Sequence, residues 1–212
     1  MSVHDEQMVN EAARLAGDHT IPADVRLMQL RELVGRDPRP RWRVTTTLDK
    51  FDGDWTGEQI AAGEATRAHA DRSVTHGNLL VIGGASALWQ RLIGTGVTAF
   101  SNSTAVLGVG DSTTAAADTQ TDLQAASNKT YKGMDSTYPL HTDSTSSSGA
   151  KTITFRATFG TSDANHRWRE WAVGNGTTTI GRMLNRKVED LDGGSAKTSA
   201  QTWQLTVTIS LA

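Results

Sequence analysis

The sequence predicts a mainly β protein: an antiparallel β-sandwich or barrel with one packed helix, preceded by a small α-helical N-terminal segment and an extended arm. Composition is the first observation, because 29 Thr, 16 Ser and 20 Gly fill 65 of the 212 positions and suit strands and turns. The second is the alternation of apolar and polar residues in two segments, 151–159 and 203–211. The third is that strand and helix signals do not alternate, which argues against a parallel α/β fold.

Charged residues divide the chain into two unequal parts. Residues 1–72 carry 10 basic and 13 acidic side chains, whereas the longer stretch 73–212 carries 11 and 10. We therefore expect a boundary near Arg72. A helical segment with an attachment arm would occupy 1–72, and a β-sandwich domain would occupy 73–212.

Two short helices are expected in the first part. Apolar residues recur at helical spacing over 5–17 and again over 22–35, where Pro22 suits a first helical turn. A pair of helices this short buries little apolar surface by itself. We therefore expect the pair to dock on the β domain or on a neighbouring subunit.

An extended arm over 39–44 follows, because Pro38 and Pro40 disfavour a further helix. This arm carries the candidate residues for contact with a capsid or another subunit, Arg39, Arg41, Trp42 and Arg43. Arginines around an indole can stack or pair with phosphate or carboxylate. The acidic balance of 1–72 favours a protein partner over a nucleic acid.

The β domain is expected to open with one buried helix within 78–94, because Ala85, Leu88, Leu92 and Ile93 fall on one helical face. Strand signals follow to the end of the chain, and they cover 105–109, 129–134, 151–159, 168–173, 182–188 and 203–211. Alternation over 151–159 and over 203–211 predicts strands with one solvent-exposed face, which favours antiparallel pairing. The polar side chains expected on the wet face of the last strand include Gln204 and Thr206.

Several classes of protein are excluded or disfavoured by composition. The absence of Cys excludes disulfides, thiolate metal sites and thiol nucleophiles. A net charge of −2 gives no basic footprint for nucleic acid, and no apolar run approaches the roughly 20 residues of a membrane span. The six His show no ligand spacing, so we expect neither a metal nor a cofactor. The acidic, polar start of the chain is unlike a secretory signal.

One pattern of catalytic type occurs, and we reject it as an enzyme's site. Asp111-Ser112 follows a predicted strand, and Asp163 and His166 lie downstream of it. In GDSL-type esterases a Ser in such a position is the nucleophile, and a downstream His, oriented by an Asp, is the base. In those enzymes nearly the whole chain of an alternating α/β domain separates the Ser segment from the Asp and His segment. Here only a short strand-rich stretch separates them. We expect no enzymatic activity.

Trp168 and Trp171 lie within the strand expected over 168–173, and alternation places them on opposite faces of it, so both faces of this strand should be covered. A carbohydrate-binding module is an alternative class of function. Its signal would be Trp168, Trp171 or Trp203 exposed on a flat sheet face.

The second part of the chain resembles a group of small virion proteins of tailed bacteriophages, particularly those of actinobacterial hosts. The ordered series that carries the resemblance is 75–80, 100–102, 107–116, 120–123, 153–165, 168–171, 183–187 and 205–208, within residues 73–212. The resemblance implies a β-rich virion component without catalytic residues. Members are described as capsid decoration, head fibre or minor tail proteins.

From these observations we expect a capsid decoration protein on the virion surface, made in the host cytoplasm. Its expected partners are the major capsid protein and copies of itself, with neither nucleic acid nor membrane involved. A minor tail, baseplate or fibre protein that contacts the host surface is the alternative. The absence of a long repeat shaft argues against a fibre.

Overall fold

The computed structural model describes residues 10, 14, 42–65 and 67–211. Residues Arg41–Ala212 form a compact unit, separate from the preceding residues Met1–Pro40. The helices expected over 5–17 and 22–35, and Arg39 and Arg41 of the arm, lie outside the described residues apart from positions 10 and 14.

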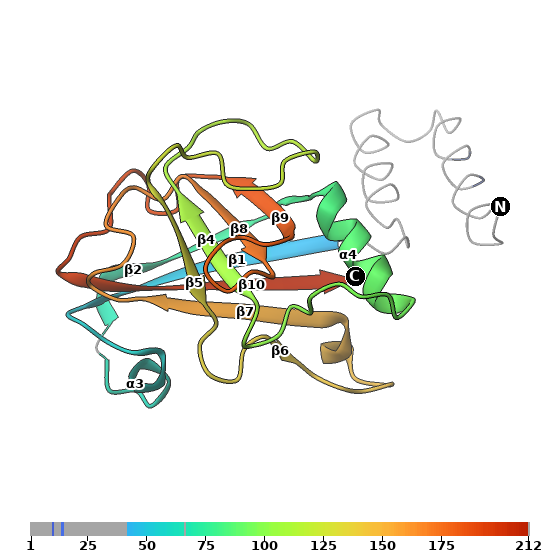
Figure 1. Cartoon of the computed structure of the whole chain (residues 1–212). Coiled ribbons are helices and arrows are strands. Elements are labelled where there is room, and N and C mark those ends of the chain that lie inside the picture. Colours follow the sequence, from blue (N-terminus) through green and yellow to red (C-terminus); the bar gives the residue numbers. More distant parts are fainter. Residues whose placement is uncertain (1–9, 11–13, 15–41, 66, 212) are drawn as a thin grey trace. The chain divides into compact units, whose positions relative to one another are not determined.

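Strands dominate this unit (Figure 1). In chain order the elements are β1 (Trp42–Asp52), α3 (Gly57–Ala61), β2 (Arg67–His76), β3 (Leu79–Leu80), α4 (Ile82–Leu92), β4 (Val106–Gly110), β5 (Lys129–Gly133), β6 (Leu140–His141), the 3-10 helix η1 (Ser148–Lys151), β7 (Thr152–Phe159), β8 (Glu170–Gly174), β9 (Met183–Val188) and β10 (Gln201–Leu211). The strands predicted over 105–109, 129–134, 151–159, 168–173, 182–188 and 203–211 are all confirmed, with ends displaced by a few residues.

The strands form two antiparallel sheets of five, which confirms the predicted β-sandwich. One sheet has the order β2-β1-β10-β7-β6 and the other the order β3-β9-β8-β4-β5. Both sheets contribute to the main core, because Leu48, Phe155 and Val207 from the first sheet belong to the same buried cluster as Val109 and Trp171 from the second. Alternation along β7 and β10 therefore places apolar residues between the sheets, as predicted.

Gln204, which was expected on the solvent-exposed face of its strand, is instead covered, and so is its neighbour Thr158 in β7. Gln204 is 4% exposed and Thr158 is 7% exposed. Gln204 Nε2 donates to Asp135 Oδ2 at 3.1 Å and to Thr158 Oγ1 at 3.0 Å. Asp135 lies on the segment after β5, and hydrogen bonds to its carboxylate satisfy the polar groups that it helps to cover.

A smaller core lies on the outer side of the second sheet. It consists of Val81, Val106, Leu123, Ala172, Ile180 and Met183. Beneath the segment 111–125 that helps to form it, Glu170 and Arg186 make an ion pair in which both side chains are fully buried, with Nη2 2.6 Å from Oε2. Glu170 also accepts from the backbone N–H groups of Gln124 and Ala125, at 3.0 and 2.7 Å. The pair thus anchors this segment to β8 and β9.

The boundary expected near Arg72 differs from the structure. β1 ends before the expected boundary and β2 crosses it. Both strands nevertheless belong to the sandwich, because β1 pairs along its whole length with β10 and β2 pairs with β1. The compact unit therefore begins at Arg41. Part of the charge of residues 42–72 lies on these two strands, where Arg72 Nε of β2 is 2.8 Å from Asp49 Oδ1 of β1.

Deleting residues 1–40 is expected to leave a folded domain that unfolds cooperatively, because all strands are retained. Deleting residues 1–50 removes most of β1 and leaves β2 without its partner, so this shorter chain should not fold. Circular dichroism during thermal unfolding compares the two. A chain of residues 41–212 without a cooperative transition would contradict the boundary.

Candidate docking surface

The helix α4 and its C-cap residue carry five of the eight large apolar residues that are exposed in the described part of the chain. It begins after Val81, whose side chain makes no capping hydrogen bond, and it ends at Ile93, where Gly94 takes a positive φ of 74°. Ile82 N–H donates to the carbonyl of Asp118 at 2.9 Å, which fixes the first turn to the segment 111–125. The helix predicted within 78–94 is thus confirmed in position.

Only the small residues of α4 are buried. Gly84 and Ala87 face the sandwich, and a Cβ atom on Gly84 would lie 2.1 Å from the carbonyl oxygen of Leu184 in β9. The helix backbone therefore approaches the strand backbone more closely than any side chain permits. Because contact through these two residues fixes how the helix is turned, its larger residues point away from the sandwich.

The larger apolar residues of α4 form one exposed face. Their exposed fractions are Ile82 57%, Leu88 40%, Trp89 65%, Leu92 74% and Ile93 72%. We call these five residues the α4 surface. The expectation that this helix is buried is therefore wrong for most of its side chains. Clustered exposed apolar residues of this size are typical of surfaces that bind another protein.

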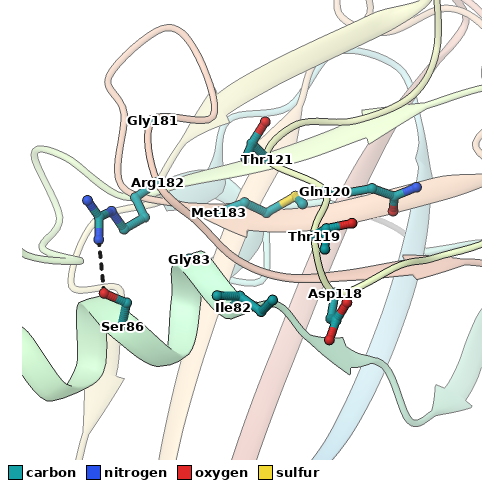
Figure 2. Close-up of a pocket in the computed structure, with 10 residues that line it drawn as sticks. All are labelled: Ile82, Gly83, Ser86, Asp118, Thr119, Gln120, Thr121, Gly181, Arg182 and Met183. Carbon is teal, nitrogen blue, oxygen red and sulfur yellow. Dashed lines mark hydrogen bonds between the residues drawn. The ribbon is translucent and has the colours of Figure 1, made fainter.

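A pocket of about 680 Å³ lies beside the first turn of α4 (Figure 2). It is lined by Ile82, Gly83, Ser86, Asp118, Thr119, Gln120, Thr121, Gly181, Arg182 and Met183. Figure 2 shows the Arg182 guanidinium above Ser86, and Nη1 lies 3.4 Å from Ser86 Oγ and 3.4 Å from Gln90 Oε1. Because Ile82 belongs to both, the pocket extends the α4 surface and can receive an apolar side chain beside one cation.

The predicted arm is only partly described. Trp42 and Arg43 are the first residues of β1, paired with Leu211 and Ser210. Trp42 is half-buried and packs against the main core, and its Nε1 donates to Asn78 Oδ1 at 2.9 Å. Trp42 is therefore tied into the sandwich, whereas the side chain of Arg43 is exposed.

The side chains of the rejected esterase pattern contact other partners instead of one another. Ser112 Oγ donates to Thr114 Oγ1 at 3.0 Å, and His166 Nδ1 lies 3.0 Å from the carbonyl of Arg167. Asp163 pairs with Lys132, with Nζ 2.5 Å from Oδ2. Within the described ranges, no group of three or more His, Asp or Glu side chains is arranged to hold a metal ion.

The tryptophans expected to mark a carbohydrate site are inaccessible. Trp168, Trp171 and Trp203 are at most 1% exposed. Trp168 precedes β8, so the expectation that it and Trp171 face opposite sides of one strand is wrong, and both lie in the main core. Trp168 packs edge-on against Trp203, with ring centroids 4.9 Å apart.

A polar hollow of about 480 Å³ contains a different tryptophan. Its wall includes Trp55, which is half-exposed and whose Nε1 donates to the carbonyl of Asp52 at 2.6 Å. Its rim includes Asp54, where hydrogen bonds from Thr161 lower the pKa of the carboxyl below its usual value. Asp135 and Lys132 also line it. An aromatic wall beside fixed polar groups suits a hydroxyl-rich ligand.

Comparisons of the chain with models of protein families, with curated proteins and with solved structures find no match. In the part of the chain that the structure describes, no helix has the length and apolar character needed to cross a membrane.

Proposed function

We propose that this protein is a virion structural protein of a tailed bacteriophage, and more specifically a capsid decoration protein. It would bind the outer surface of the major capsid lattice, as a homo-oligomer, and stabilise that lattice. The resemblance of residues 73–212 to small phage virion proteins supports the class. The observation that carries the attachment role is the α4 surface, because it leaves Trp89, Leu92 and Ile93 largely exposed on one helix.

Decoration needs only a modest contact per copy. A protein that binds the assembled lattice but not its dissociated subunits stabilises the lattice by mass action. Many symmetric copies, or several sites on one oligomer, raise the effective affinity further. The α4 surface supplies apolar area for such a contact, and Arg43 and Arg182 add exposed cations near the start of β1 and beside α4. Catalysis and bound nucleic acid have no place in this function.

Binding to purified capsids that lack the protein tests the proposal. We expect the full chain to co-sediment with such particles, to reach saturation at hundreds of copies per particle, and to raise the temperature at which they dissociate. The chain of residues 41–212 should bind more weakly, because it lacks Arg39 and the rest of the N-terminal segment. Saturation at a handful of copies would contradict decoration and favour a tail position.

A minor tail, baseplate or fibre protein that binds host carbohydrate is the second candidate, and the Trp55 hollow favours it. Replacing Trp55 with Ala is then expected to weaken oligosaccharide binding by about 10- to 100-fold, because a stacked indole supplies much of the contact. Glycan-array binding and calorimetry measure the change. Trp89→Ala is the matched control, since it removes an exposed indole elsewhere; equal losses in both variants would contradict a site at Trp55.

A further inference from the structure

Lys197 is a buried lysine whose amine contacts only neutral groups among the described residues. The residue is 1% exposed. Its Nζ donates to the carbonyl of Gly160 at 2.6 Å, to Asn165 Oδ1 at 3.0 Å and, at 3.5 Å, to the carbonyl of Thr198. Burying an ammonium group without a carboxylate in contact is costly.

The neighbouring amide of Asn165 is held in place. Its Nδ2 donates to the carbonyl of Thr161 at 2.7 Å while its Oδ1 accepts from Lys197. The amide is thus fixed at both ends within the loop that joins β7 to β8. Asn165 is exposed on its outer side, so a small leaving group can reach solvent.

We propose that Lys197 and Asn165 form an intramolecular isopeptide bond. The unprotonated Nζ attacks Cγ of Asn165, the Cγ–Nδ2 bond breaks, and the amide nitrogen leaves as ammonia. One proton passes from Nζ to the departing nitrogen, so the reaction needs neither an oxidant nor a cofactor. Nζ already lies 3.0 Å from Oδ1 of this amide, so the nucleophile and the group that it attacks are held next to each other. The product is a neutral amide where a buried cation stood.

The surroundings of Lys197 favour this reaction. Burial lowers the pKa of its ammonium to about 8, so an appreciable share of the amine is unprotonated near neutral pH. The carboxylates of Asp163 and Asp54 and the ammonium of Lys132 are the other charges that act on it. Asp163 belongs to the same loop as Asn165 and accepts from Gly160 N–H at 3.0 Å.

The bond would join two loops at one end of the sandwich. Asn165 follows β7 and Lys197 precedes β10, and these two strands are neighbours in one sheet. The chain has no Cys, so a disulfide cannot provide such a link. An amide link resists reduction and closes a long loop in the unfolded chain, which stabilises the fold.

Intact-mass spectrometry of the purified full chain tests the inference directly. We expect a mass lower than that of the unmodified sequence by one ammonia, whereas the variants Lys197→Met and Asn165→Ala should show their unmodified masses. Incubation at about pH 9 should complete the reaction faster than at about pH 6, because the lysine amine loses its proton between these values. Lys132→Met, which removes a neighbouring ammonium but neither reacting group, should still react.

Peptide mapping separates this bond from ammonia loss elsewhere, such as succinimide formation at Asn175-Gly176. Trypsin should yield residues 157–167 linked to residues 188–212, because a modified Lys197 blocks cleavage after it. Release of the free peptide 188–197 in full yield, or ammonia loss without the linked peptide, would overturn the proposal. The result of this test does not depend on the proposed decoration function, because no capsid is needed for it.

Discussion

Replacing Arg186 with Met is expected to lower the free energy of unfolding by about 3–5 kcal/mol, because it leaves a buried carboxylate without its partner. Arg186 and Glu170 are both fully buried, with Nε and Nη2 of the arginine 2.8 and 2.6 Å from the same oxygen of Glu170. Arg186 also donates to Gln120 Oε1 at 2.8 Å and to the carbonyl of Thr114 at 3.0 Å. Chemical denaturation followed by circular dichroism measures the change.

Two controls separate burial of the charge from loss of an ion pair in general. Lys129→Met removes the partner of Asp122 in a pair whose side chains are 30% and 38% exposed, so it should cost about 1 kcal/mol at most. Replacing both buried partners, as Glu170→Gln with Arg186→Met, should cost less than Arg186→Met alone. A loss below about 1 kcal/mol for Arg186→Met would contradict the assigned role of the pair.

Hydrogen exchange should locate the effect of the buried pair in the segment that it anchors. The N–H groups of Gln124 and Ala125 donate to the two carboxylate oxygens of Glu170, so both should lose protection when Glu170 is replaced by Ala. Released from these bonds, the segment 111–125 would no longer cover the smaller core or hold the first turn of α4 through Asp118.

The strands with one wet face could be predicted from the sequence, because their apolar residues recur at every second position. β7 and β10 follow this rule, with Phe155, Ala157, Leu205 and Val207 all buried. β1 obeys the same rule through Val44 and Leu48, but its charged residues and the preceding prolines favoured an arm instead. β1 pairs with β10, which lies far from it in the sequence, and no pattern of neighbouring residues predicts such a long-range pairing.

The candidate site was less accessible to prediction. The period of apolar residues located α4, but periodicity alone cannot tell whether the larger residues face the protein or the solvent. The signal that could have decided this is Gly83-Gly84 together with Ala87, because small residues on one side of a helix permit close backbone contact. The tightly fitted Gly84 turns the opposite side outward. The Glu170–Arg186 pair was likewise hidden, since neither residue's sequence neighbours indicate burial.

The α4 surface should bind its partner through Trp89 and Leu92. Replacing both with Glu is expected to weaken binding to capsids by about 100-fold or more, equivalent to about 2.7 kcal/mol or more, because large apolar residues at the centre of an interface dominate its free energy. The same change should leave the stability of the isolated domain within about 0.5 kcal/mol, since the two residues are 65% and 74% exposed. Co-sedimentation with capsids and thermal unfolding measure the two quantities.

Leu140→Glu is the matched control for this change, because Leu140 is 52% exposed but lies away from α4. It belongs to β6, whereas α4 packs on β9, which is a strand of the other sheet. It adds one negative charge at an exposed apolar position, as each of the two α4 substitutions does, so a loss of binding caused by charge alone would also appear in this variant. Loss of binding in the α4 variant but not in Leu140→Glu would assign the attachment to α4. Full binding by the Trp89 and Leu92 variant would instead exclude the α4 surface as the attachment site, and the contact would then have to be sought in residues 1–41 or at Arg43.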